Sequence, residues 1–170
     1  MAIILNVTGP HKILFGTVGG TPSTELGRAD NDDLFAIDLE YKYQDIYTNE
    51  LGQNPANAIL MGATAFVNFT LVAYDPDKLS DLFEQIDGRS GSGFLFPQVG
   101  KLAYDSVTAA SSFLVSLKVS PDIANSPTYT VDRCRLITHT VKDIGNKPTR
   151  AAFKFEILPG TAGSAIYTKS

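Results

Sequence analysis

Apolar and polar residues alternate strictly between residues 34 and 43. One side of this segment carries large apolar or aromatic side chains, at Phe35, Ile37, Leu39, Tyr41 and Tyr43. The other side carries Ala36, Asp38, Glu40 and Lys42. Because successive side chains of a strand point to opposite faces, the pattern predicts a half-buried strand with one face in water.

A second long strand is predicted over residues 61–73, which are rich in apolar and β-branched residues. Its two faces again differ: Val67, Phe69 and Leu71 share the apolar face, and Thr64, Asn68 and Thr70 share the wetter face. Phe66 is an apolar exception on the wetter side.

Three further strands are predicted in the second half of the chain, over residues 113–119, 128–141 and 150–158. The middle one is long enough to be one strand or a strand with a bulge. A turn over residues 143–148 joins it to the last strand as a hairpin, with Phe153, Phe155 and Ile157 inward and Lys154 and Glu156 outward. Arg133 and Arg135 share a face, where they either pair with carboxylates or lie on an exposed edge.

One helix is predicted over residues 76–86. Asp75 can cap it, Pro76 suits the first helical position, and Gly88 ends it. Its apolar side chains fall at helical spacing, at Leu79, Leu82, Phe83 and Ile86. Residues 16–33 and 45–60 are expected to be long loops, because they contain turn residues and no clear pattern, and loops of that length are functional or disordered.

The chain has 170 residues and a net charge of -4, so we expect a single domain over residues 1–170 and no grip on nucleic acid phosphates. Cys134 is the only cysteine, which excludes an intrachain disulfide and predicts simple core packing. No apolar run reaches about 18 residues, so no membrane helix is expected. Residues 1–7 lack a basic leader, and we expect synthesis in the cytoplasm.

The sequence offers little for catalysis or metal binding, and we expect neither an enzyme nor a cofactor. His11 and His139 are the only histidines, and no Gly-x-Ser-x-Gly motif is present. The acidic cluster Asp30, Asp32 and Asp33 lacks the rest of a calcium loop, and residues 88–93 lack the rest of a phosphate loop. Asp38 and Glu40 have the spacing of a glycosidase pair, but any alternating polar face produces such pairs. The glycosylation motif at Asn68 lies within a predicted strand and is discounted.

The order of short motifs from residue 11 to residue 83 resembles the tail tube, or major tail, proteins of tailed bacteriophages. The resemblance rests on Phe15-Gly16-Thr17, Asp33-Leu34, Gln44-Asp45-Ile46-Tyr47-Thr48, Gly52-Gln53-Asn54-Pro55, Gly62, the strand from Ala65 to Tyr74 and the helix from Lys78 to Phe83. It covers about half of the chain and is a likeness of topology with no single invariant motif.

This resemblance implies an all-β fold, a β-sandwich or barrel with one flanking helix, that assembles into hexameric rings stacked into a tube. The genome passes through the lumen as double-stranded DNA, without tight binding. Asp38, Glu40, Asn68 and Thr70 are the candidate lumen-facing residues, and the alternative is that they face solvent outside the tube. Expected partners are other copies of the chain and the tape measure, terminator, baseplate and sheath proteins. The expected location is the virion, and residues 162–170 have no counterpart in the family.

The sequence leaves two other interpretations of the function open. The chain could be another virion protein, such as a tail terminator, neck or baseplate component. It could also be a carbohydrate-binding β-sandwich, which its seven tyrosines favour and its lack of tryptophan weakens.

Overall fold

A computed structural model describes residues 11–29, 35–47, 55–87, 113–122, 126–142, 150–158 and 165–170. These residues form mainly antiparallel strands and one helix, which confirms the predicted all-β class with a single helix. The elements are β1 (His11–Thr17), β2 (Thr24–Ala29), β3 (Ala36–Tyr47), β4 (Pro55–Tyr74), α1 (Pro76–Asp87), β5 (Val115–Pro121), β6 (Tyr129–Lys142), β7 (Arg150–Ile157) and β8 (Thr168–Lys169).

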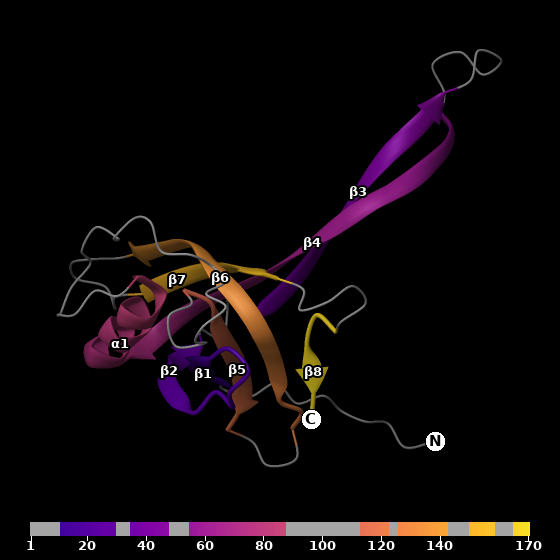
Figure 1. Cartoon of the computed structure of the whole chain (residues 1–170). Helices are drawn as coiled ribbons and strands as arrows, with labels where there is room; N and C mark the ends of the chain where they lie inside the picture. The colour runs from indigo at the N-terminus through magenta and orange to yellow at the C-terminus, as the bar shows by residue number, and fades with distance from the viewer. Residues whose placement is uncertain are drawn as a thin grey trace.

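Six of the strands close into an antiparallel barrel. They pair in the order β2-β1-β5-β6-β7-β4, and a further pairing of β2 with the end of β4 completes the ring. β3 pairs with residues 55–68 of β4, and β8 pairs with the start of β6 (Figure 1). Closure of the ring gives each barrel strand a neighbour on both sides. Among the described residues, edges without a neighbour remain where strands extend beyond the barrel.

The barrel interior is filled by the apolar faces that the sequence predicts. Val67, Phe69 and Leu71 of β4 are buried, and so are Phe153, Phe155 and Ile157 of β7. Phe69 lies at the centre, because its ring stacks on those of Phe35, Phe153 and Phe155 at centroid distances of 6.2, 5.3 and 5.9 Å. Such aromatic contacts add to the stability gained from burying apolar area.

The helix agrees with its sequence signals. The backbone N–H of Asp77 donates a hydrogen bond of 2.9 Å to Oδ1 of Asp75, so Asp75 is the N-cap. Leu79, Leu82 and Phe83 are buried in the barrel core. Near the end of the helix, Nε2 of Gln85 donates to the backbone oxygen of Gly16 at 3.0 Å and so ties α1 to β1. The predicted end at Gly88 lies outside the described residues.

The prediction of a long loop over residues 16–33 is wrong in part, because it contains β2. This strand has no clear alternation, since Leu26, Gly27 and Ala29 are all buried. Gly27 allows β2 to approach β4 closely: a Cβ at this position would lie 2.4 Å from the backbone oxygen of Ala73. The acidic residues Asp30, Asp32 and Asp33 lie outside the described residues.

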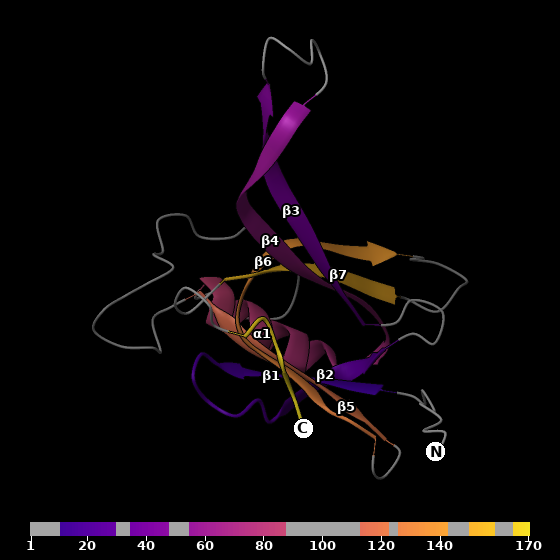
Figure 2. The same cartoon turned by 90° about the vertical axis from the view of Figure 1, so that its right-hand side faces the viewer.

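The second predicted loop, residues 45–60, is also wrong in part. β3 continues to Tyr47 and β4 begins at Pro55, so both strands run far beyond the barrel. Residues 39–47 of β3 and 55–64 of β4 form a two-stranded projection, here called the arm, which extends away from the barrel (Figures 1 and 2). The prediction that residues 34–43 are half-buried therefore holds for Phe35 and Ile37 only, because no layer covers the arm within the described part of the chain.

β5, β6 and β7 follow the sequence closely, whereas β8 was not predicted. β6 is one long strand whose register shifts against both neighbours, as a bulge requires, and it forms an antiparallel hairpin with β7. Cys134 is fully buried on β6, and its thiol donates to the backbone oxygen of Val115 at 3.1 Å. The predicted turn at 143–148 and the glycine-rich stretch at 88–93 lie outside the described residues.

Candidate assembly surface

The four strands β3, β4, β7 and β6 lie next to one another and share one outward face, here called the polar face. Their registers align side chains into rows across the sheet. One row joins Asp38, Phe66, Glu156 and Arg135, and the next joins Ala36, Asn68, Lys154 and Thr138. Directly paired residues of a sheet point to the same side, so these rows identify one continuous surface.

Three side-chain contacts connect this surface across its strands. Nδ2 of Asn68 donates to Oδ2 of Asp38 at 2.5 Å, and Nε of Arg135 donates to Oε2 of Glu156 at 2.6 Å. The Lys154 ammonium lies 4.3 Å from the centroid of the Phe66 ring. Phe66 is therefore the apolar exception on the polar face that the sequence indicates, and it serves as a platform for a cation.

The four candidate lumen residues divide into two groups. Asp38, Glu40 and Asn68 share the polar face, and the hydrogen bond joins two of them. Thr70 is on the same side of β4, but only 3% of it is exposed, so it adds no polar surface in the isolated chain. Of the two arginines singled out on β6, Arg135 pairs with the carboxylate of Glu156.

The polar face is bounded by two strand edges without a strand partner among the described residues. β3 pairs with β4 on one edge only, and β6 leaves β5 at Cys134 while continuing to Lys142. Between these edges the four strands alternate in direction, because each pairing is antiparallel. Unpaired edges of this length can accept a strand from another chain.

The arm exposes large apolar side chains, of which the sequence pattern assigned Tyr41 and Tyr43 to a buried face and Leu60 to a loop. Tyr41 is 54% exposed, Tyr43 is 62% exposed and Leu60, which pairs with Tyr43, is 54% exposed. The rings of Tyr41 and Tyr43 lie on the same side at a centroid distance of 6.2 Å. Alternation alone cannot distinguish a face covered by the same chain from one that awaits another molecule.

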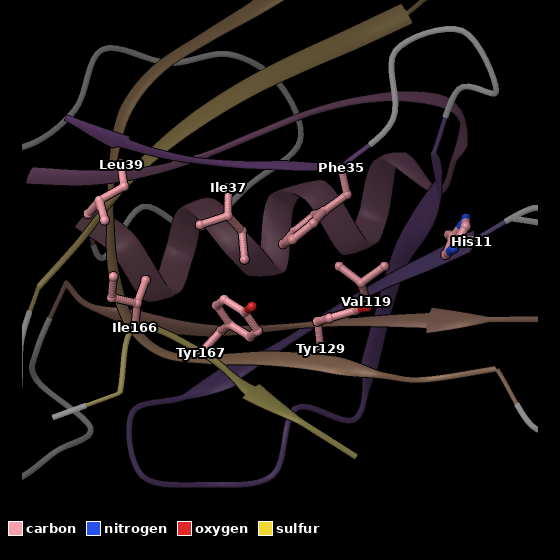
Figure 3. Close-up of a pocket in the computed structure, with 8 residues that line it drawn as sticks. All are labelled: His11, Phe35, Ile37, Leu39, Val119, Tyr129, Ile166 and Tyr167. Carbon is pink, nitrogen blue, oxygen red and sulfur yellow. The ribbon is translucent and has the colours of Figure 1, made fainter. Parts of the chain in front are cut away.

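At the base of the arm, the apolar side of β3 borders a groove of about 430 Å³, here called the base groove. Phe35, Ile37 and Leu39 point into it from β3, with α1 behind them in the view of Figure 3. The other lining residues are His11, Val119, Tyr129, Ile166 and Tyr167. The C-terminal segment thus supplies one wall, an assignment that no sequence signal indicates.

Histidine, cysteine and carboxylate side chains are scattered over the described part of the chain. No set of three or more His, Cys, Asp and Glu residues is placed to hold a metal ion there. The ring of His139 packs near those of Phe83 and Phe153, at centroid distances of 4.9 and 6.3 Å. In the same described residues, no helix is long and apolar enough to cross a membrane.

Comparison with protein families finds no match, and comparison with curated proteins finds none either. Among solved structures, the chain is similar to a chain in the cryo-EM structure of the anti-feeding prophage baseplate, which was six-fold symmetrised. The TM-score is 0.56 at 7% sequence identity, and the match covers 100% of this chain and 97% of that chain. The two chains share a fold over essentially their whole length.

Proposed function

We propose that this protein is a structural subunit of a phage virion, and more specifically a tail tube subunit. In this proposal it assembles into stacked hexameric rings around a lumen through which the viral genome passes. Its partners are other copies of itself and the tape measure, terminator, baseplate and sheath proteins. The fold shared with a chain of a prophage baseplate supports the virion assignment.

The observation that carries the proposal is the polar sheet, whose two edges have no strand partner among the described residues. Four strands of alternating direction end in β3 on one side and β6 on the other. An even number of strands lets β3 of one copy pair with β6 of the next while the antiparallel alternation continues. Repetition of one such contact around an axis closes a ring.

The size of that ring suits a conduit for DNA. Six copies would supply twenty-four strands, and a spacing of about 4.8 Å then gives a backbone diameter of about 37 Å before strand tilt is added. Barrels of about 16–18 strands already leave a water-filled channel. Six-fold symmetry is supported by the symmetrised baseplate that contains the similar chain.

The polar face would line the lumen, because in the barrel part of β4 and in β7 the opposite face is buried in the core. Asp38, Glu40 and Glu156 contribute three carboxylates to this face, and the cations on it are Lys42, Arg135, Arg150 and Lys154. Arg135 is already paired with Glu156. Acids and bases nearly balance on this lining, so DNA phosphates would meet no continuous basic stripe and could slide without being held.

Electron microscopy of the purified chain over a range of concentrations and salt tests the proposal. We expect rings with a central hole that class averages show to be six-fold, and longer tubes at higher concentration. Analytical ultracentrifugation of the same samples should show the matching large species. Monodisperse monomers at every concentration and salt would rule the proposal out.

A baseplate, neck or terminator component is the second candidate, because the similar chain comes from a baseplate. Such a component completes one ring and stops, whereas a tube subunit continues to add rings. The copy number in a purified particle separates the two: a tube subunit is present in many rings, and a baseplate subunit in one or two.

A further inference from the structure

The base groove is an apolar opening that the described residues leave uncovered. Its lining includes no Asp, Glu, Lys or Arg side chain. Phe35, Ile37 and Ile166 are partly buried and pack against the core, so the groove is continuous with the interior of the barrel. Covering such a surface with another apolar group is favourable by roughly 25 cal/mol per Å².

The exposed side of the arm has matching chemistry. Tyr41, Tyr43 and Leu60 are apolar or aromatic, and each is more than half exposed. They lie on the same side of β3 as Ile37 and Leu39, which line the groove. The two apolar surfaces are therefore neighbours along one strand, and together they cover β3 from its start to Tyr43.

The arm cannot fill the groove of its own chain. Tyr43 lies six residues beyond Ile37 on one continuous strand, which corresponds to about 20 Å along the strand direction. A strand cannot fold back over its own preceding residues without a turn, and β3 has none up to Tyr47. An arm that fills a base groove must therefore come from a second copy.

We infer that the base groove receives the apolar side of the arm, at Tyr41, Tyr43 and Leu60, from a second copy of this chain. The inference rests on the proposed assembly and identifies the surfaces that meet in it. Donor and acceptor are different surfaces, so the contact is head-to-tail, and each copy keeps a free arm at one end and a free groove at the other. Such a contact adds copies without limit unless another component covers the groove.

The inference also gives the C-terminal segment a function. β8 is held on β6 by a short ladder, and Thr128 and Ser170 exchange two backbone hydrogen bonds of 2.7 and 3.0 Å. Tyr167 packs edge-on against Tyr129, at a centroid distance of 5.7 Å, and 44% of Tyr167 is exposed. This arrangement places Ile166 and Tyr167 as the wall opposite Phe35 and Ile37.

One arm-to-groove contact is too small to hold two copies together alone. A fully covered aromatic side chain buries about 150–250 Å², so two half-exposed tyrosines and one leucine bury a few hundred Å² on the arm side. A stable interface buries about 800 Å² per partner. The contact therefore acts in sets, once a ring presents several grooves to several arms.

A cysteine pair tests the contact in the assembled protein. We combine Tyr43→Cys on the arm with Tyr167→Cys in the groove, in a chain whose native Cys134 is fully buried and does not interfere. Mild oxidation should convert most of the protein into a ladder of disulfide-linked dimers, trimers and longer chains on a non-reducing gel. A Leu60→Cys and Tyr167→Cys pair repeats the test with Tyr43 intact.

The matched control combines Tyr43→Cys with Asp81→Cys on the exposed face of α1 and should give at least tenfold less ladder. Rings or tubes that form without a ladder in either groove pair would overturn the inference and leave the proposed function standing. An equal ladder in the control would overturn it as well. Absence of any assembly by microscopy would overturn the proposed function and this contact with it.

Discussion

The side-chain amide of Asn68 donates a hydrogen bond to the carboxylate of Asp38 across the β3–β4 pair, at 2.5 Å. The two residues are thirty positions apart in the sequence, and the bond ties the start of β3 to the part of β4 that forms the barrel wall. Because the bond lies at the surface, it contributes little to the free energy of unfolding. The bond joins two side chains of the polar face and so helps to define that surface.

Reversal of charge on the polar face should create a lumen that holds DNA. We expect the free energy of unfolding of the Asp38→Lys and Glu40→Lys double variant to lie within about 1 kcal/mol of that of the parent, because both sites are exposed. Its assembled particles should retain short duplex DNA at low salt and protect it from nuclease, and release it as salt rises.

The matched control places the same charge change on the outside, with Asp77→Lys and Glu84→Lys on the exposed side of α1. DNA bound to those particles should stay open to nuclease digestion. Equal protection in both variants, or in neither, would contradict the assignment of the polar face to the lumen.

Phe69 and Phe66 are three residues apart on β4 and should differ sharply in what they contribute to stability. Phe69→Ala removes a ring that stacks on three others in the core, and should lower the free energy of unfolding by about 3–5 kcal/mol. Phe66→Ala removes a partly exposed ring under Lys154 and should cost about 1 kcal/mol. Urea unfolding followed by circular dichroism measures both, and similar losses would show that the faces of β4 are misassigned.

Gly27→Ala tests the closure of the barrel. The added methyl group would lie 2.4 Å from the backbone oxygen of Ala73 and 2.9 Å from Cβ of Tyr74, so β2 and β4 must separate. We expect a loss of about 1–3 kcal/mol, as for other overpacked sites, measured by thermal or urea unfolding. Thr24→Ala, on the same strand, is the control and should change stability by well under half of that amount.

Burial in the core raises the pKa of the Cys134 thiol, because the thiolate would lose its hydration. Below the unfolded-state pKa of about 8.5 both states keep the proton. Above it the unfolded chain releases the proton first, so the free energy of unfolding should fall by up to about 1.4 kcal/mol per pH unit. Urea titrations at pH 7 to 10, roughly the range before tyrosine and lysine ionise, measure this slope.

The Cys134→Ala variant should lose the part of this pH dependence that the thiol causes, whatever its stability at pH 7. In the parent, a thiol reagent should modify Cys134 only after unfolding, because the side chain is fully buried. Rapid modification of the native protein would contradict the burial that underlies both expectations.

Alternation along the chain predicted the barrel strands well, because one face of each is covered by the same molecule. Val67, Phe69 and Leu71 and the matching positions of β7 are inside, as the period of two requires. The helix was predictable for a similar reason, since Asp75, Pro76 and the apolar stripe are local signals. Local patterns suffice where the neighbour that covers a face belongs to the same domain.

The arm and β2 were harder to predict, for two different physical reasons. Tyr41 and Tyr43 alternate with polar residues as a buried face does, but nothing in their own chain tells what covers them. β2 is short, and its exposed residues Glu25 and Arg28 are separated by two buried ones, so the strand shows no alternation with a period of two. The base groove joins segments as distant as His11, Phe35 and Tyr167, which only the barrel closure brings together.

β4 belongs to two parts of the molecule at once, since its twenty residues run from the outer half of the arm into the barrel wall. Its barrel half is fixed by β7 and β2, and the direction of the arm is set by where that half lies. A genetic screen for variants that fail to assemble into particles would therefore find substitutions in the core as well as in the arm. The core substitutions would be found although core residues contact no neighbouring copy. Only growth at lower temperature would separate them, because it restores a weakened core and cannot replace a missing contact.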